Sequence, residues 1–326
     1  MDLTFYLREA AEVLLPMLFA IAAAPLFAGW IAQCRAWMQN RSAPPLLQPY
    51  RTLRKLFLKE AALATNASPL FRTAPYVLFG TMVLAATIIP SVATGLPFAE
   101  VADAIALIGL FATARVFMAL AAMDVGTAFG TLGARREMMI GFLAEPALLM
   151  VLFNAFLLSG STALPRLVEA YRAHPALIEP SLLFASVAFL MVLLAENARV
   201  PIDNPATHLE LTMIHEAMLL EYSGRHLALM EWAASLKLFN YACIGFALFL
   251  PWGIATEPDG HWAQILIAIA LLAVKLAVAG AALSFIETVS AKLRLFRAPE
   301  YLAAAFLLAV LGLLVHLLLG GSHSDS

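Results

Sequence analysis

Residues 262–287 read WAQILIAIALLAVKLAVAGAALSFIE, a stretch that is apolar at almost every position. An α-helix rises about 1.5 Å per residue, so about 20 apolar residues cross a hydrocarbon core of roughly 30 Å. The stretch therefore predicts a transmembrane helix. Its basic residue, Lys275, stands near the middle, where the lysine stem is too short to reach the membrane surface.

The same pattern recurs along the rest of the chain. Of the 326 residues, 62% are hydrophobic and 13% are charged, whereas soluble domains have about half apolar and about a quarter charged residues. Runs long enough to span a bilayer lie near 13–33, 75–95, 101–123, 146–164, 180–198, 236–256, 262–287 and 300–320. The sequence thus predicts an all-α integral membrane protein, a single membrane domain over residues 1–326 with about eight transmembrane helices.

Basic residues mark one side of the membrane, because positively charged loops stay in the cytoplasm. The loops after the first, third, fifth and seventh expected spans hold most of the lysines and arginines, and the opposite side holds Arg8, Arg166 and Arg172. An even number of spans then places both termini on the outer side. The net charge of -2 argues against a nucleic-acid partner.

The first cytoplasmic loop is long and contains an amphipathic stretch. Its apolar residues recur at helical spacing and its basic residues cluster away from them. The apolar set is Leu46, Tyr50, Leu53 and Phe57, and the basic set is Arg51, Arg54, Lys55 and Lys59. Such a helix lies in the lipid headgroup layer with its apolar side down, or on a partner protein with its basic face solvated, and both arrangements can hold together.

Ionisable residues crowd one apolar segment. Residues 195–234 read AENARVPIDNPATHLELTMIHEAMLLEYSGRHLALMEWAA, with carboxylates at Glu196, Asp203, Glu210, Glu216, Glu221 and Glu231. Partial burial raises carboxylate pKa values by desolvation and mutual repulsion, as proton transfer near neutral pH requires. The alternative is a solvated loop of helix caps and structural ion pairs, for example between Glu196 and Arg199.

Four further charges lie within or beside expected spans. They are Arg115, Glu145, Lys275 and Glu287. A charge at the bilayer centre costs about 2.5–3.5 kcal/mol, so such groups usually line water or pair with each other. They are expected to face the helix bundle or a partner, and a single structural ion pair is the alternative.

The residue types argue against a metal or redox centre in this chain. Cys34 and Cys243 are the only cysteines, whereas a single iron–sulfur cluster usually takes four protein ligands. His215-Glu216 begins like a zinc-protease helix but lacks the second histidine, and His208 stands seven positions away without a third ligand. No cofactor and no metal are expected here.

Motifs inside the charged segment resemble those of a known family. Ala195-Glu196, the run from Arg199 to Asp203 (RVPID) and the run from Glu221 to Gly224 (EYSG) are similar to the signature of complex I subunit 1, the membrane protein that joins the two arms of that respiratory enzyme. Glu145 matches a glutamate of the same family. The resemblance covers nearly the whole chain and implies eight spans, an outward N-terminus and an inner (plasma) membrane of bacterial or archaeal type.

Other motifs are similar to the hydrogenase branch of that family, which comprises formate hydrogenlyase subunit 4, hydrogenase-4 component C and the membrane subunit of CO-induced hydrogenases. These motifs are the longer stretch 207–220, GARREM at 133–138 and RAPE at 297–300. The first loop has Gln48-Pro49 without the respiratory Gly-Pro-Asn before it, which counts against a quinone site.

The resemblance implies a non-catalytic membrane-anchor subunit of a group 4 [NiFe]-hydrogenase complex. The [NiFe] site and Fe–S clusters would then lie in partner subunits: the hydrogenase large and small subunits, an Fe–S subunit and an antiporter-like membrane subunit. Candidates for the proton path or for coupling are Glu145, Glu196, Asp203, Glu210, Glu216, Glu221, Lys275 and Arg115. Candidates for the docking interface are Arg51, Arg54, Lys55, Arg135, Arg136 and Arg199.

Three other functions remain open at this point. The first is the quinone-site subunit of a respiratory NADH dehydrogenase, which neighbouring genes for a hydrogenase large subunit would argue against. The second is a stand-alone proton-coupled carrier, which would be active as an isolated protein. The third is a purely structural anchor, in which the carboxylates are dispensable.

Overall fold

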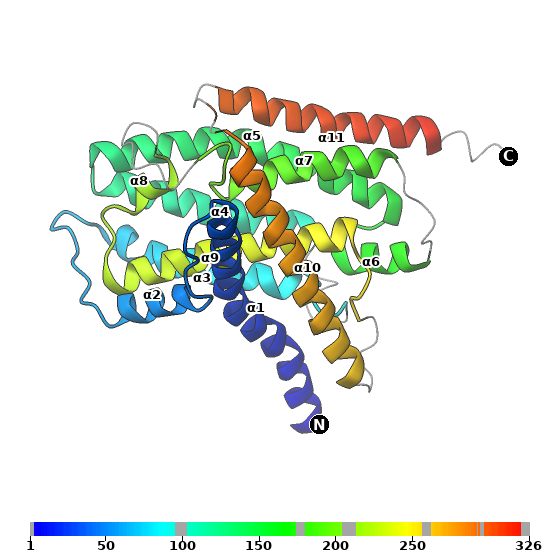
Figure 1. The fold of residues 1–326 in the computed structure, drawn as a ribbon, viewed down its shortest axis with the longest axis horizontal. Coiled ribbons are helices and arrows are strands. Elements are labelled where there is room, and N and C mark those ends of the chain that lie inside the picture. Colours follow the sequence, from blue (N-terminus) through cyan, green and yellow to red (C-terminus); the bar gives the residue numbers. More distant parts are fainter. Residues whose placement is uncertain are drawn as a thin grey trace.

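The computed structural model describes residues 3–94, 103–173, 180–203, 213–255, 262–291, 293 and 297–320. Within these ranges the regular elements are helices, with one isolated backbone bridge between Ala93 and Ala255. In chain order they are α1 (Leu3–Met38), α2 (Gln48–Phe57), α3 (Pro69–Ile88), α4 (Ala104–Asp124), α5 (Ala128–Ser159), α6 (Leu164–Ala173), α7 (Pro180–Glu196), α8 (His215–Leu219), α9 (Gly224–Phe249), α10 (Trp262–Val289) and α11 (Ala298–Gly320). The expected all-α class is confirmed (Figure 1).

Over the described ranges, seven helices are long and apolar enough to cross a bilayer: α1 from Pro16 onward, α3, α4, α5, α9, α10 and α11. α7 is a shorter apolar helix of 17 residues. At 1.5 Å per residue it extends about 26 Å, close to the hydrocarbon thickness of roughly 30 Å. The eight helices together are consistent with the eight crossings that the sequence predicts.

Several membrane helices begin earlier than the apolar runs suggested, and the difference exceeds ten residues in two of them. α5 begins at Ala128 rather than near 146, and α9 begins at Gly224 rather than near 236. Charged residues such as Arg136 and Glu231 interrupt the apolar pattern there, but they are good helix formers and do not stop the helix. α5 also continues through Pro146, which a membrane helix tolerates. The segments of 124–145 and 224–235 expected as loops are therefore mostly helical.

Side chains of the residues that precede α3 and α4 cap the starts of these helices. Ser68 precedes α3, its hydroxyl accepts from the Leu70 N–H, and Pro69 occupies the first turn. Asp103 precedes α4 and accepts from the N–H groups of Ile105 and Ala106. These caps satisfy backbone donors that a helix leaves unpaired at its N-terminus.

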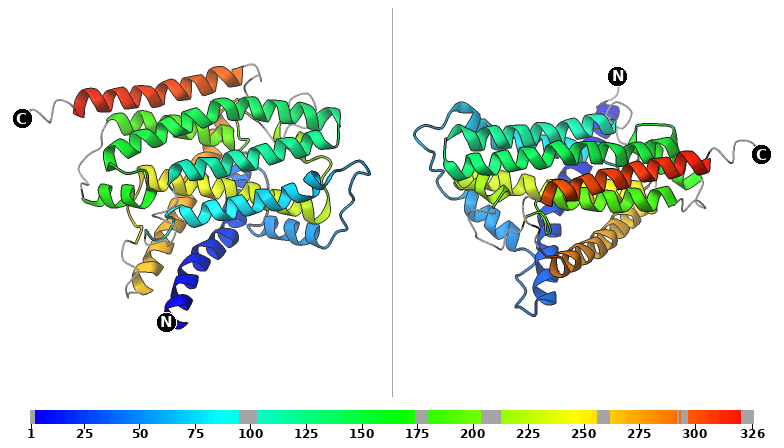
Figure 2. Two further views of the ribbon diagram at one scale, coloured as in Figure 1. Left: turned by 180° about the vertical axis from the view of Figure 1, so that it is seen from behind. Right: turned by 90° about the horizontal axis from the view of Figure 1, so that it is seen from above.

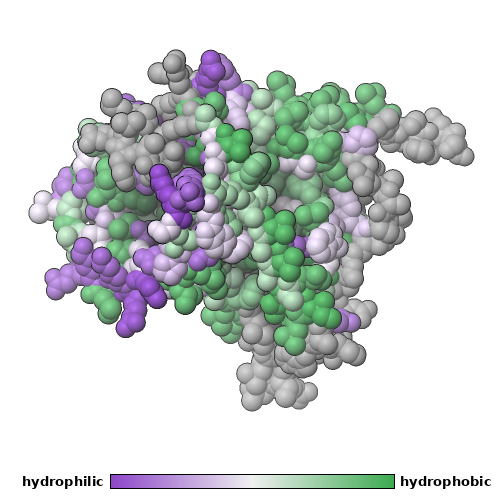
Figure 3. All heavy atoms as spheres, in the orientation of Figure 1, coloured by the Kyte–Doolittle hydropathy of each residue, from purple (hydrophilic) through white to green (hydrophobic). Residues whose placement is uncertain are grey.

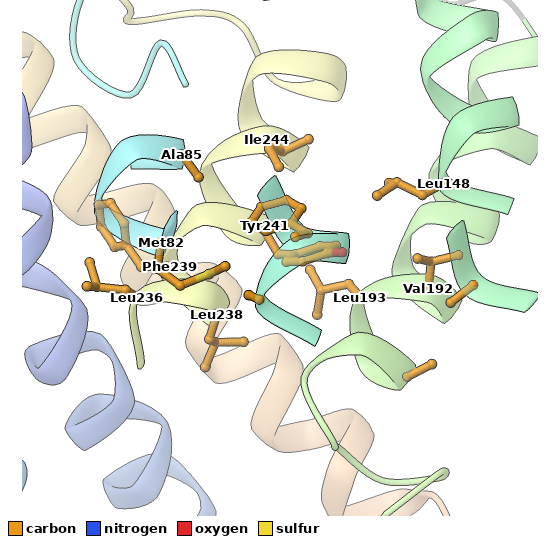
Figure 4. Packing of buried hydrophobic residues seen from close by; sticks show 14 of the residues in the cluster. Met82, Ala85, Leu148, Val192, Leu193, Leu236, Leu238, Phe239, Tyr241 and Ile244 are labelled. Carbon is orange, nitrogen blue, oxygen red and sulfur yellow. The ribbon is translucent and has the colours of Figure 1, made fainter. Parts of the chain in front are cut away.

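The long helices form one bundle with two inclined members. α3, α4, α5, α7, α9 and α11 run roughly side by side, whereas α1 and α10 cross them at a marked angle (Figures 1 and 2). α7 contacts α11 and α5, α3 contacts α4 and α9, and α1 contacts α10. Figure 4 shows Met82, Leu193 and Tyr241, from α3, α7 and α9, gathered inside the bundle, where Tyr241 is fully buried.

The short helix α2 packs its apolar side on this chain. Leu53 is buried, Phe57 meets the ring of Trp232 on α9 edge to face at 6.1 Å, and the Tyr50 hydroxyl donates to the carbonyl of Ala22 on α1. α2 contacts both α1 and α9. Leu47 just before α2, Phe57 at its end and Leu58 just past it keep exposed apolar surface that can meet lipid or a partner.

Polarity divides the molecule along its length. Figure 3 shows hydrophilic residues at the end that carries α2 and α8, and hydrophobic residues over α10. Exposed apolar side chains of α10 include Leu266, Val274, Val278 and Phe285, as a lipid-facing helix requires. Which end faces the cytoplasm stays a prediction from the distribution of basic residues.

Candidate functional site: a buried charge cluster among four helices

Arg115, in the middle of α4, is the centre of a buried cluster of charges. Its guanidinium donates to the carboxylates of Glu145 on α5 and Glu196 at the end of α7, and its Nε lies 3.9 Å from Glu137 Oε1 on α5. The planar fork of donors in arginine suits several carboxylates at once. One side chain thus joins α4, α5 and α7 inside the membrane bundle.

A glycine makes room for this arrangement. A Cβ at Gly141 on α5 would lie 2.6 Å from Cζ of Arg115, closer than real side chains approach. Gly141 therefore lets the guanidinium lie directly against the α5 backbone. The sequence around it, 139–143, gives no other sign of this role.

Glu196 also binds a second cation. Lys237 Nζ, on α9, lies 2.9 Å from Glu196 Oε2, so this carboxylate bridges Arg115 and Lys237. Glu196 is 5% exposed and Arg115 is 6% exposed, whereas the Glu145 side chain is about one-third exposed. The cluster therefore extends from the buried interior to a more accessible carboxylate.

A cavity of about 50 Å³ lies beside this cluster. In the part of the chain that the structure describes, its ionisable lining residues are Arg115, Glu137, His215 and Lys237. The rest of the lining is apolar, from α3, α4 and α9. Since a water needs roughly 10–15 Å³ of such space, the cavity has room for about three to five waters beside the charged groups.

The half-buried residue His215, at the start of α8, brings an imidazole to this cavity. Desolvation lowers the pKa of His215 and Lys237 lowers it further, while the carboxylates of Glu137 and Asp203 oppose the change. The imidazole is therefore held toward its neutral form. Burial disfavours the charged state more than the nearby carboxylates restore it.

Asp203 anchors the polypeptide around α8. It is buried, and its Oδ2 accepts from the N–H groups of Ile214 and His215 at 3.3 Å each. A second fixing point is Arg136, whose Nη1 donates to the Met213 carbonyl at 3.0 Å. Asp203 thus positions the start of α8, and its expected place on the proton path stays a prediction.

An ion pair between Glu196 and Arg199 is the structural alternative that the sequence suggests, but Arg199 pairs with another carboxylate. It lies 2.9 Å from Glu287 Oε1 near the end of α10, and Arg35 at the end of α1 lies 3.5 Å from Glu287 Oε2. The reason is geometric: α7 ends at Glu196, and the chain then turns toward α10. Glu196 instead pairs with Arg115 on α4 and Lys237 on α9.

Lys275 lies apart from the central cluster. It is buried, donates to the carbonyl of Leu250 at 2.6 Å and to that of Trp252, and sits 4.4 Å from the centre of the Trp252 ring. These carbonyls belong to the end of α9, which a cation stabilises. Lys275 faces the protein as expected, and its partners there are backbone and aromatic groups.

The remaining predicted site residues are placed as follows. Glu216 and Glu221 are half-buried, on α8 and just after it, and Glu210 lies outside the described residues. Among the docking candidates, Arg51, Arg54, Lys55 and Arg135 are exposed, whereas Arg136 and Arg199 are half-buried and hold the internal contacts above. The described residues contain no group of three His, Cys, Asp or Glu side chains that could hold a metal.

Sequence reasoning missed Glu137 and Lys237 as members of the site. Lys237 opens an otherwise apolar run, and that position was the available signal. Glu137 stands in the GARREM stretch, whose resemblance to the hydrogenase branch carries no information on its partners. Both residues reach Arg115 or Glu196 only through tertiary packing.

Comparisons with known proteins agree with this fold. The model of the family described as NADH dehydrogenase matches residues 11–318. Formate hydrogenlyase subunit 4 of Escherichia coli (strain K12) is 34% identical over 90% of this chain and 95% of that protein. Hydrogenase-4 component C of the same organism is 36% identical over 74% of this chain and 78% of that protein.

More distant relatives share less of the sequence. An NADH-quinone oxidoreductase subunit of Rickettsia typhi is 30% identical over 56% of this chain and 54% of that protein. A chain in the structure of the membrane-bound sulfane sulfur reductase, an archaeal respiratory membrane complex, superposes with a TM-score of 0.80. That match covers 93% of this chain and 98% of the other at 20% identity, so it supports the fold.

Proposed function

Since this chain belongs to the NADH dehydrogenase family of complex I subunit 1 proteins, we propose that it serves in a formate hydrogenlyase-like [NiFe]-hydrogenase complex as the subunit that docks the soluble redox arm and takes part in proton translocation. Two hydrogenase-complex proteins match it over most of their lengths, whereas the quinone-oxidoreductase relative matches over about half. What those relatives have in common is that each is a complex I-like membrane subunit.

The Arg115 cluster is the observation that carries the proposal. Three carboxylates and two cations meet inside the bundle, although each charge at membrane depth costs about 2.5–3.5 kcal/mol. Well-packed apolar residues would serve a mere anchor as well or better. A cluster of shared cations and carboxylates beside a cavity instead suits the movement of protons, because protonating one carboxylate frees a cation for another.

Docking would use the exposed basic surface at the hydrophilic end. Arg51, Arg54 and Lys55 project from α2 while its apolar side is held by α1 and α9, and Arg135 is exposed near the start of α5. Basic side chains on a rigid helix steer and orient an acidic partner. The proposed partners are the hydrogenase large and small subunits and an Fe–S subunit, with an antiporter-like subunit in the membrane.

The metal chemistry would reside in those partners. Cys34 and Cys243 are buried on α1 and α9, and each is a free thiol. Buried thiols of this kind are usually inert. The [NiFe] site and the Fe–S clusters are accordingly assigned to the soluble subunits, and this chain contributes charge and shape.

A quinone-site subunit is the second candidate. A cavity of about 190 Å³ lies between α1, α2 and α9, lined mainly by small and apolar groups with Glu231 and Ser235. Sites for small organic ligands are usually about 300–1,000 Å³. The volume is smaller than this range, so the hydrogenase assignment ranks first.

Co-purification tests the proposal. The chain, tagged at its C-terminus and expressed with its neighbouring genes, is expected to carry a hydrogenase large subunit out of detergent-solubilised membranes. Inside-out vesicles holding the complex should evolve hydrogen and change their internal pH during turnover. A preparation with no hydrogenase subunit, or one that reduces a soluble quinone instead, would contradict the assignment.

A further inference from the structure

The short helix α8 is fixed in place at the edge of the cavity. Asp203 accepts from the N–H groups of Ile214 and His215, and Arg136 binds the carbonyl just before them. A Cβ at Gly133 on α5 would lie 2.8 Å from the Ile214 carbonyl oxygen, so α8 lies directly on the α5 backbone. His215 is therefore held at the cavity by contacts that do not involve its imidazole.

The position of His215 is intermediate between surface and interior. His215 is half-buried at the start of α8, whereas Arg115 and Glu196 are buried. It lines the same cavity as Glu137 and Lys237. A proton that moves between the surface and Glu196 by this route passes the imidazole before it meets the cluster.

Among the ionisable groups that line the cavity in the described residues, histidine has the chemistry of a proton relay. Arg115 stays protonated in proteins, and the ordinary pKa of lysine is about 10.4, against about 6.5 for histidine. An imidazole accepts a proton on one ring nitrogen and releases the proton of the other, so charge is balanced without any redox change. Water in the cavity can bridge the imidazole and the Glu137 carboxylate.

We propose that His215 relays protons between the hydrophilic end of the molecule and the cavity beside Arg115. The relay rests on the proposed function. It adds a histidine to the carboxylates that are the candidates for the proton path. Among the described residues, the charged groups around His215 are Arg115 from α4, Glu137 from α5, Lys237 from α9 and Asp203 before α8. Together they set the range of pH over which the relay operates.

The test compares variants of the assembled complex with the unmodified complex in inside-out vesicles. Formate drives turnover, and a pH-sensitive dye inside the vesicles reports proton movement. His215→Gln is expected to keep the subunit content and to lower the rate of proton movement about tenfold or more, as the loss of a positioned proton-transfer group does. His226→Gln is the matched control, because His226 is buried on α9 beside Tyr76 and does not line the cavity.

A second variant separates relay from structure. His215→Gly leaves space for free imidazole, and added imidazole should restore proton movement in His215→Gly while leaving His226→Gln and the unmodified complex unchanged. A structural role for the ring predicts no such rescue. If His215→Gln assembles and moves protons at the normal rate, the relay is wrong.

Glu196→Gln distinguishes this inference from the proposed function. Reduced proton movement in Glu196→Gln together with a normal rate in His215→Gln would overturn the relay and leave the proposed function standing. Normal rates in both variants would overturn the two together. If His215→Gln fails to assemble, His215→Glu replaces it in the test, because glutamate keeps a titratable group. His215→Glu should assemble and move protons with an altered pH dependence. A pH profile identical to that of the unmodified complex would overturn the relay.

Discussion

Arg115 and Glu196, 81 positions apart in the sequence, form an ion pair buried inside the helix bundle. The pair ties α4 to α7, and through Lys237 it also reaches α9. A buried pair of this kind contributes little to stability when compared with apolar packing, yet removal of one partner is costly. The pair thus offers a direct way to separate folding from function.

Replacing Arg115 with Met should destabilise the chain, because the buried Glu196 and the partly exposed Glu145 lose the cation that they share. The expected cost is about 3–5 kcal/mol. The thermal midpoint of the detergent-solubilised complex and the amount of chain in the membrane measure it. The double variant Arg115→Met/Glu196→Gln should recover part of the loss, and an equally unstable double variant would argue that the pair is not responsible.

Gly141→Ala should disturb Arg115 without changing any charge. The new Cβ would lie 2.6 Å from Cζ of Arg115, so the guanidinium has to move away from α5. We expect a lower thermal midpoint and slower proton movement. Gly109→Ala on α4 is the matched control, because a Cβ there meets nothing within 4 Å and alanine favours a helix by about 1 kcal/mol. Equal effects of the two substitutions would contradict this role for Gly141.

Glutamine at Glu145, Glu196 or Glu221 should leave the complex assembled and lower its coupled turnover. Glutamine keeps the size and hydrogen bonding of glutamate but cannot carry a proton to the next group. Subunit content and hydrogen evolution are measured in the same membranes. Glu300→Gln, an exposed position at the start of α11, is the control. Normal assembly, turnover and ion movement in all three variants would favour a purely structural anchor.

Stability should fall on mild acidification because of His215. Its pKa is lowered in the folded chain, chiefly by desolvation. The unfolded chain binds a proton near the ordinary histidine value of about 6.5 and the folded chain does so only at a lower pH. The unfolding free energy therefore decreases as the pH falls below about 6.5 and levels off beneath the folded pKa. Thermal midpoints from pH 8 to pH 5 should show a smaller decrease in His215→Gln.

Side-directed labelling tests the orientation. Arg54→Cys and Arg135→Cys are exposed positions at the hydrophilic end, and Thr162→Cys is exposed between α5 and α6. The native Cys34 and Cys243 are buried and serve as the background. An impermeant maleimide on intact cells should label Thr162→Cys alone. The reverse pattern would overturn the topology and, with it, the docking surface.

The sequence predicts the membrane helices well and their charged ends poorly. The run 262–287 corresponds to α10, because lipid requires a continuous apolar helix with its backbone groups paired internally. The search for apolar runs does not detect the first part of α5, because Arg136 and Glu137 are charged although they are helical. A span and a helix differ wherever the helix extends beyond the lipid.

The site was predicted in part, for a physical reason. The acidic motifs and the deep position of Arg115 identify side chains that need partners, since unpaired charge at depth is costly. The sequence does not say which partner each receives: Glu196 binds Arg115 and Lys237, and Arg199 binds Glu287 instead. Such pairings depend on which helices become neighbours, which no local pattern encodes.

The turn from Arg199 to Asp203 has a mechanical consequence. Asp203 donates its N–H to the Arg199 carbonyl, Arg199 binds Glu287 of α10, and the Pro201 carbonyl accepts from the N–H of Leu293 just past α10. Asp203 at the same time holds the start of α8. The turn therefore connects the end of the inclined helix α10 to the start of α8 through hydrogen bonds and an ion pair, so a displacement of α10 would be transmitted to the rim of the cavity.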